Sequence, residues 1–164
     1  MEASTARRAQ ALASPSRNLA GLLAKAWGLN GQAIRILPYP IDIARLSAQP
    51  WTAHPPTVLF VGRFEPRKGV HVLVEAVPQV IARVSQAHFV FVGGHAENAA
   101  GAEPFMKRLL EQLDALGCRD RVTFVAWQKP DALLEFYRKA WVVAIPSLYD
   151  NYPNVCLEAM ASAR

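Results

Sequence analysis

Residues 57–69 of the chain, TVLFVGRFEPRKG, decide the fold class. The apolar run Val58–Val61 is typical of a strand that is buried on both faces of a sheet. A short charged connection from Gly62 to Gly69 follows, and apolar residues then recur at helical spacing over 70–84. The stretch therefore predicts a strand, a tight loop and a helix in direct succession.

The same alternation continues along the rest of the chain. Further strands are expected at 88–92, 122–125 and 141–145, and further helices at 106–116, 130–137 and 154–164. Alternating strands and helices with apolar strands predict an α/β fold with a doubly wound parallel sheet. Ligands bind such sheets beyond the carboxyl ends of the strands. The loops of interest are therefore 62–69, 93–97, 127–129 and 146–153.

The N-terminal part follows a separate pattern. Short strands are expected at 9–13 and 34–37, on either side of a helix that begins at Ser14-Pro15 and ends at Gly28. Prolines then cluster at both ends of residues 38–56, which predicts a connector between two units. The expected organisation is a first unit over 1–37, a connector over 38–56 and a second unit over 57–164.

The composition sets limits on the class of protein. A chain of 164 residues, 52% hydrophobic and 19% charged, is not a disordered protein. Its net charge of +5 permits a phosphate-rich partner without identifying it. Cys118 and Cys156 have no metal-like or disulfide-like spacing, so a reducing, cytoplasmic location is expected. The sequence shows neither a signal-peptide pattern nor an apolar run long enough to span a bilayer.

The loop 62–69 has the features of a diphosphate site. Arg63 and Lys68 place two cations beside the N-terminus of the following helix, where backbone N–H groups and the helix dipole favour an anion. Gly62 and Gly69 allow the backbone to approach a ligand closely. The alternative is a solvated charged loop, which is common after a strand.

Two carboxylates, Asp150 and Glu158, form the second candidate site. Because Pro153 starts the last helix, Asp150 lies in the loop before it and Glu158 lies about one and a half turns into it. Groups this far apart suit hydroxyls on two parts of one elongated ligand better than a shared metal. Asp150 can instead be a charge that favours the helix dipole. Glu158 stands in an apolar segment, so we expect it to have a ligand or a partner.

Several absent motifs narrow the chemistry. The sequence has no G-x-G-x-x-G, no Walker-type phosphate loop, no nucleophile-elbow serine and no Asp-x-Asp pair. Its four histidines lack the spacing of zinc ligands, so no metal is expected. Aromatic residues do not alternate with basic ones, so no nucleic-acid partner is expected.

Three blocks taken together resemble a known family. Gly62-Arg63-Phe64 with Lys68-Gly69, then Gly93-Gly94, then Pro146-Ser147 with Asp150 and Leu157–Ala161 are similar in order and spacing to the C-terminal domain of retaining glycosyltransferases of family 4, or group 1. The resemblance implies the GT-B fold, with a Rossmann-like donor-binding domain. Residues 1–37 resemble the end of that family's N-terminal acceptor domain, and 38–56 its interdomain connector.

The resemblance also implies roles for single residues. Arg63 and Lys68 would hold the diphosphate of a nucleotide-sugar donor, and Glu158 would bind the ribose hydroxyls. Asp150 would meet the hydroxyls of the transferred sugar, and the backbone amides of Asn151 and Tyr152 would face the sugar or the phosphate. No catalytic residue, cofactor or metal is assigned.

The chain departs from the family pattern in three respects. The family usually has Glu where this chain has Asp150, whose side chain is one methylene shorter. The chain also lacks most of the N-terminal domain and stops before the last segments of the C-terminal domain, so we expect a fragment that is inactive by itself. The donor base and sugar, the acceptor (a glycan, a lipid or a small molecule) and peripheral membrane association of the full-length parent stay open.

Three other interpretations also stay open. The first is a non-catalytic nucleotide-sugar-binding pseudoenzyme or a truncated gene product. The second is a basic nucleic-acid-binding module, which only the net charge favours. The third is a sugar-nucleotide epimerase of similar architecture, which fits the block from Asp150 to Ala161 less well.

Overall fold

The computed structural model describes residues 2–29, 34–47, 54–94 and 102–164. The chain forms two compact units, each with its own elements. The first comprises Met1–Ile41 with Asn151–Asn154, and the second comprises Asp42–Asp150 with Val155–Arg164. The second unit contains the larger sheet and most of the residues singled out by the sequence.

The first unit is built on a pair of short parallel strands. Its elements are α1 (Glu2–Arg8), β1 (Leu12–Ser14), α2 (Arg17–Trp27) and β2 (Ile34–Ile36), and β1 pairs with β2. The predicted helix start at Ser14-Pro15 is wrong. Ser14 is the last residue of β1, and Ser16 caps α2, its Oγ accepting a hydrogen bond from the Leu19 N–H at 3.2 Å. Gly28 ends α2 as predicted, in the left-handed conformation.

The second unit is organised around a four-stranded parallel sheet. Its strands are β3 (Thr57–Arg63), β4 (His88–Gly94), β5 (Val122–Val125) and β6 (Val142–Val143), in the order β5-β4-β3-β6. All three pairings are parallel, which confirms the predicted doubly wound sheet. β6 is shorter than the predicted strand 141–145, although Trp141 and Ala144 still donate backbone hydrogen bonds to the β3 residues Thr57 and Leu59.

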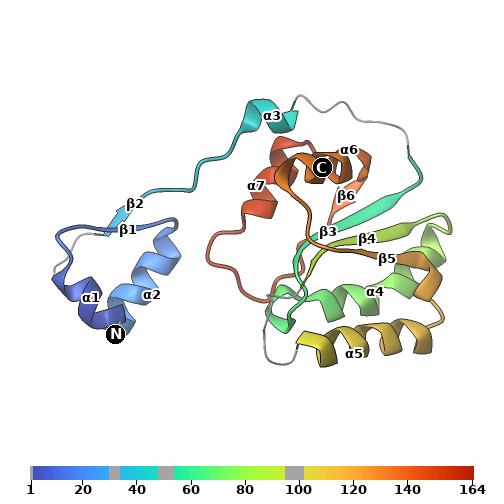
Figure 1. The fold of residues 1–164 in the computed structure, drawn as a ribbon, viewed down its shortest axis with the longest axis horizontal. Coiled ribbons are helices and arrows are strands. Elements are labelled where there is room, and N and C mark those ends of the chain that lie inside the picture. The colour runs from blue at the N-terminus through green and yellow to red at the C-terminus, as the bar shows by residue number, and fades with distance from the viewer. Residues whose placement is uncertain (1, 30–33, 48–53, 95–101) are drawn as a thin grey trace. The chain divides into compact units, whose positions relative to one another are not determined.

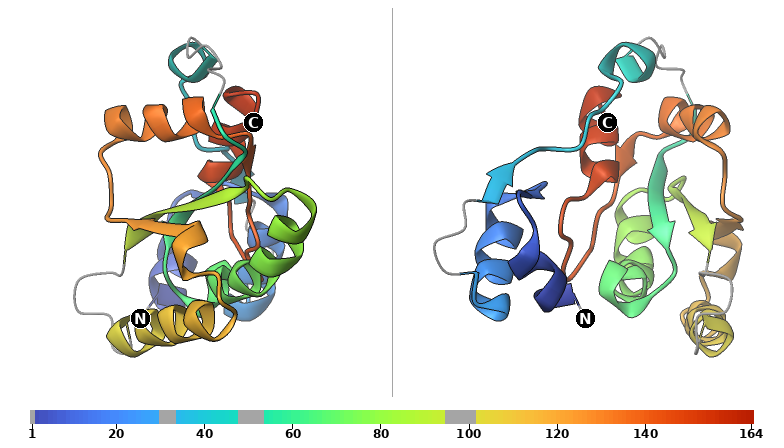
Figure 2. Two further views of the ribbon diagram at one scale, coloured as in Figure 1. Left: turned by 90° about the vertical axis from the view of Figure 1, so that its right-hand side faces the viewer. Right: turned by 60° about the vertical axis from the view of Figure 1, so that its left-hand side comes forward.

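Helices cover both faces of this sheet. The helices after the first unit are α3 (Ile43–Ser47), α4 (Val70–Arg83), α5 (Ala102–Ala115), α6 (Pro130–Lys139) and α7 (Asn154–Ala161), with single 3₁₀ turns η1 (Pro66–Lys68) and η2 (Arg119–Arg121). α4 and α5 lie on one face, and α6 lies on the other (Figures 1 and 2). α3 is a helix inside the segment 38–56, which the prolines predicted only as a connector. α7 ends three residues before the predicted end at 164, because Ala163 adopts a positive φ of 55°.

The core of the second unit lies between the sheet and the pair α4 and α5. It is formed by aromatic side chains of β3 and β4 and by the apolar faces of the two helices, and includes Phe60, Phe89, Phe91, Val70, Val74, Val77, Leu109 and Leu113. Each of these is at most 2% exposed. Burial of a side chain of this size contributes about 1.5–3 kcal/mol. This packing holds the end of β3 and the start of α4 in place, and so fixes the loop between them.

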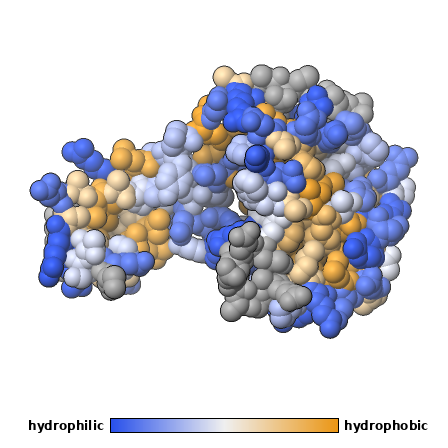
Figure 3. Space-filling view, in the orientation of Figure 1, coloured by the Kyte–Doolittle hydropathy of each residue, from blue (hydrophilic) through white to orange (hydrophobic). Residues whose placement is uncertain are grey.

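Apolar residues also reach the surface. Hydrophobic and hydrophilic residues are interspersed on the face drawn in Figure 3. Among the described residues, the large apolar side chains with the greatest exposure are Trp127, Leu148 and Met160, at 68%, 67% and 70%. Trp127 and Leu148 both follow a strand of the sheet, in the loops after β5 and β6.

The strand order reverses at β3. The chain proceeds from β3 through β4 to β5 on one side, and then returns to place β6 on the other side of β3. The loops that follow β3 and β6 therefore lie next to each other at the carboxyl end of the sheet, the usual ligand position in this architecture. A hydrogen bond of 2.9 Å from the Leu148 N–H to the Arg67 carbonyl oxygen joins the two loops.

Gly69 is expected to be essential for this close approach. Its φ is +69°, and a Cβ at this position would lie 2.0 Å from the Pro146 carbonyl oxygen. Gly117 has a similar φ of +62°, but nothing lies within 4 Å of a Cβ there. Gly117→Ala should therefore cost only the left-handed backbone penalty of about 1–2 kcal/mol, and Gly69→Ala about 2 kcal/mol more. Denaturant unfolding of the two variants measures the difference, and equal losses would contradict the assigned contact.

Candidate functional site

The loop after β3 is shaped by one 3₁₀ turn. Glu65 is its N-cap in an extended conformation, Pro66 occupies its first position, and Gly69 closes it in the left-handed conformation. Gly69 is at the same time the N-cap of α4. Lys68 therefore stands immediately before the N-terminus of α4, where the helix dipole favours an anion.

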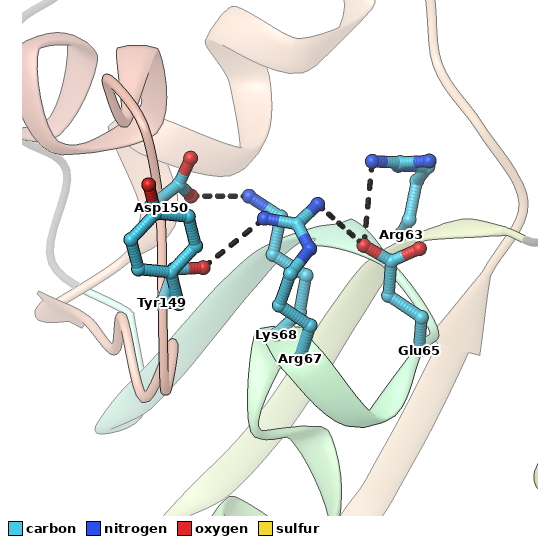
Figure 4. A network of polar contacts seen from close by, with 6 residues as sticks. All are labelled: Arg63, Glu65, Arg67, Lys68, Tyr149 and Asp150. Carbon is cyan, nitrogen blue, oxygen red and sulfur yellow. Dashed lines mark hydrogen bonds and ion pairs between the residues drawn. The ribbon is translucent and has the colours of Figure 1, made fainter. Parts of the chain in front are cut away.

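An ion pair between Lys68 and Asp150 joins the two loops. The Lys68 Nζ meets the Asp150 carboxylate, and the side chains are only 19% and 17% exposed. Figure 4 shows this pair beside a second set of contacts, in which Arg67 also joins the two loops. The sequence placed these residues in two separate blocks 82 positions apart, and the structure brings them together. Each of the two charges thus has a partner of opposite charge within the protein.

Arg67 and Glu65 form a second set of contacts next to this pair. The Arg67 guanidinium donates to the Tyr149 carbonyl oxygen at 3.0 Å and to Glu65 Oε1 at 2.6 Å. Arg63 also lies 3.3 Å from Glu65 Oε1, and its side chain is 55% exposed (Figure 4). Arg67 is therefore occupied by contacts within the protein, while Arg63 keeps much of its surface open to solvent. From the sequence, no function was expected of Arg67 or Glu65.

Glu158 has a protein partner, as its apolar surroundings in the sequence led us to expect, and that partner is Tyr137. The Tyr137 hydroxyl, from α6, donates a hydrogen bond of 2.7 Å to Glu158 Oε2 on α7. The sequence did not identify this pair, which joins residues 21 positions apart. The signal was present, because a buried tyrosine hydroxyl usually needs a hydrogen-bond partner and Glu158 stood alone in an apolar segment.

Tyr137 is almost fully buried, at 1% exposure. Burial raises the pKa of its hydroxyl far above the ordinary value of 10.0, and the hydrogen bond to Glu158 and the charge of that carboxylate raise the pKa further. The hydroxyl therefore stays protonated and acts as a donor at neutral pH.

Asn151 and Tyr152 belong to the first unit and contact other residues of that unit. The Asn151 carbonyl oxygen accepts a hydrogen bond of 3.2 Å from Ser16 Oγ. The Tyr152 ring packs edge to face on Tyr39, with ring centroids 5.4 Å apart. Both residues thus have contacts within the first unit, and the ligand contacts assigned to their backbone amides stay a prediction.

The part of the chain that the structure describes contains no group of three or more His, Cys, Asp or Glu side chains arranged to hold a metal ion. The same described ranges include no helix long and apolar enough to cross a membrane. In the predicted ligand loop 93–97, residues 95–97 lie outside the described residues.

The buried Tyr137 hydroxyl should make the protein sensitive to alkaline pH. Above pH 10 the tyrosine ionises in the unfolded chain but stays protonated in the folded protein. Its contribution to stability is therefore complete below pH 10 and falls above it, by about 1.4 kcal/mol per pH unit. Denaturant unfolding between about pH 9 and pH 11 should show a shallower loss for Tyr137→Phe. The control Tyr39→Phe, at an exposed position, should keep the wild-type slope; equal slopes for all three proteins would refute the assignment.

Comparison with known proteins gives glycosyltransferases as relatives. D-inositol 3-phosphate glycosyltransferase of Rhodococcus jostii is 38% identical over 105 residues, which are 63% of this chain and 23% of that protein. An uncharacterized glycosyltransferase of Methanocaldococcus jannaschii is 35% identical over 105 residues, 64% of this chain and 25% of that protein. The chain thus spans about a quarter of the length of the relatives that it matches.

Solved structures show the same fold. Sucrose-phosphate synthase of Thermosynechococcus elongatus matches with a TM-score of 0.79 and 29% identity, over 98% of this chain and 41% of that one. HepE of Anabaena in complex with UDP-glucose matches with a TM-score of 0.76 and 22% identity, over 99% of this chain and 45% of that one. These neighbours are GT-B glycosyltransferases, which confirms the fold implied by the resemblance.

The family model "Glycosyl transferases group 1" matches residues 55–164. The match covers more than half of the chain and includes the whole sheet of the second unit, both loops joined by Lys68 and Asp150, and the helix that carries Glu158. The chain therefore belongs to the group 1 glycosyltransferases.

Proposed function

We propose that this chain binds the nucleotide-sugar donor of a glycosyltransferase that transfers the sugar with retention to a glycan, lipid or small-molecule acceptor. The observation that carries the proposal is the Lys68–Asp150 pair at the point where the strand order reverses. It joins a cation suited to a diphosphate with a carboxylate suited to sugar hydroxyls. Transfer itself is proposed for the protein to which the chain belongs, since the chain spans about a quarter of its relatives.

The diphosphate would bind between Lys68, Arg63 and the N-terminus of α4. Lys68 acts as a point charge, and the guanidinium of Arg63 can hold two phosphate oxygens at once. The leaving diphosphate gains negative charge as the bond to the sugar breaks. Fixed cations and a helix dipole stabilise that charge without reorganising. The proposal therefore includes no metal ion.

Donor binding would exchange the partners of the ion pair. A diphosphate that reaches Lys68 replaces the Asp150 carboxylate, which is then free to accept hydrogen bonds from the hydroxyls of the attached sugar. Lys68 thus has an anionic partner in both states, whereas Asp150 exchanges the ammonium group for neutral hydroxyl donors. Asp150 is one methylene shorter than the glutamate usual in the family, and it lies within reach of Lys68 in the structure.

The remaining proposed contacts are to the ribose, the sugar and the phosphate of the donor. Glu158 would accept hydrogen bonds from the ribose hydroxyls, and the backbone amides of Asn151 and Tyr152 would contact the sugar or the phosphate. The complex of HepE with UDP-glucose supports a nucleotide-sugar donor for this fold. The D-inositol 3-phosphate glycosyltransferases support a small polar acceptor as one of the open acceptor classes.

Lys68→Ala is expected to weaken nucleoside diphosphate binding about tenfold or more, because a charge-assisted contact to phosphate is lost. Isothermal titration of the chain with UDP, GDP and ADP measures it. Lys107→Ala is the matched control, since the Lys107 side chain is 77% exposed on α5. Binding of none of the three diphosphates, or equal binding by both variants, would overturn the proposal.

Asp150→Asn should separate the effect of Asp150 on diphosphate binding at Lys68 from its effect on sugar binding. The neutral amide no longer competes for Lys68, so nucleoside diphosphate should bind about threefold more tightly. The same variant should gain less affinity from an attached sugar than the wild-type chain gains, since the carboxylate that accepts sugar hydroxyls is absent. Titration with a diphosphate and its sugar conjugate tests both statements, and weaker diphosphate binding by the variant would contradict the exchange.

A further inference from the structure

We propose that Tyr137 is a positioning residue that holds the Glu158 carboxylate ready for the two ribose hydroxyls of the donor, and so gives the site its preference for ribonucleotides. The inference rests on the proposed function, in which Glu158 binds the ribose. It assigns a role to a buried polar group that the donor does not touch.

The geometry fixes one oxygen of the carboxylate. The Tyr137 hydroxyl donates to Glu158 Oε2 at 2.7 Å, a short distance typical of a hydrogen bond to a charged oxygen. A phenol has a single proton to donate, and here it is committed to Glu158. In the described part of the chain no other group forms a hydrogen bond or ion pair with this carboxylate. Oε1 and the second lone pair of Oε2 are thus available to a ligand.

Tyr137 is itself held firmly on α6. Its ring is 1% exposed, so the hydroxyl cannot turn away into solvent without opening the packing. Its carbonyl oxygen accepts hydrogen bonds from Arg164 Nε at 3.0 Å and from the Ala140 N–H at 3.3 Å. The backbone and the ring of Tyr137 therefore both have fixed positions relative to α7.

The helix that carries Glu158, α7, is also fixed in position next to Tyr137. Ala159, the next residue of α7, is only 4% exposed, and Arg164 links the chain after α7 to Tyr137. A glutamate has three rotatable side-chain bonds, and ordering them on ligand binding costs free energy. In the unbound protein the hydrogen bond from Tyr137 already orders the Glu158 side chain, so little of this free energy is lost when a ligand binds. The free oxygen sites can then meet a vicinal diol without rearrangement.

This arrangement predicts discrimination between sugars. A ribose presents two adjacent hydroxyls that can donate to one carboxylate, whereas a 2′,3′-dideoxyribose presents none. A site built to accept hydroxyl hydrogen bonds rejects the analogue that lacks them, because the carboxylate stays unpaired. The preference should depend on Tyr137 only through Glu158.

The test is isothermal titration of the 164-residue chain with the best-binding ribonucleoside diphosphate and its 2′,3′-dideoxy analogue. The proteins are the wild type, Tyr137→Phe, Glu158→Ala and the double variant. Tyr137→Phe keeps the buried ring and removes only the hydroxyl. It should weaken binding of the ribonucleotide about fivefold to tenfold and leave binding of the dideoxy analogue unchanged. In the Glu158→Ala background the same substitution should have no effect on either ligand.

The outcomes distinguish this inference from the proposed function. Equal weakening of both ligands by Tyr137→Phe would mean that Tyr137 only ties α6 to α7, and would overturn the positioning role. An undiminished effect of Tyr137→Phe in the Glu158→Ala background would overturn it as well. If the wild-type chain binds both ligands equally, the ribose hydroxyls contribute nothing to binding. That result would overturn this inference but not the proposed diphosphate site. A chain that binds neither ligand would overturn the proposed function and this inference with it.

Discussion

Pairing of β6 with the side of β3 opposite β4 is the constraint on which the candidate site depends. It places the loop after β6 beside the loop after β3, although 82 positions separate Lys68 from Asp150. The core between the sheet and α4 holds the first loop, and the glycine at position 69 allows the second to come close. Without this strand order, the cation and the carboxylate would belong to unrelated parts of the surface.

Much of this organisation could be predicted from the sequence. The apolar run at 58–61 and the helical spacing after Gly69 indicated a strand, a loop and a helix, and the alternation that follows indicated a parallel sheet. Both patterns are strong because the residues involved are buried, and burial leaves a periodic trace in the sequence. The rule that ligands bind at the carboxyl ends of strands then selected the loops that the structure brings together.

The errors and omissions have a different physical origin. The cap of α2 is Ser16 and not Ser14, because two serines flank one proline and local pattern cannot tell which hydroxyl meets the free N–H groups. The bond between Tyr137 and Glu158 and the contacts of Arg67 join elements distant in the sequence. No periodicity records such pairs, since each depends on how helices and loops pack in three dimensions.

Arg67 has a consequence for protein engineering. Its guanidinium bridges Glu65 in one loop and the Tyr149 carbonyl oxygen in the other (Figure 4). Its own carbonyl oxygen accepts a hydrogen bond from the Leu148 N–H. Segments 65–68 and 146–150 therefore form one structural unit that is built from two separate stretches of the chain. If only one segment were replaced by that of a relative with different specificity, the contacts between the two loops would be lost. Replacing both segments together would transfer the loops with their mutual contacts intact.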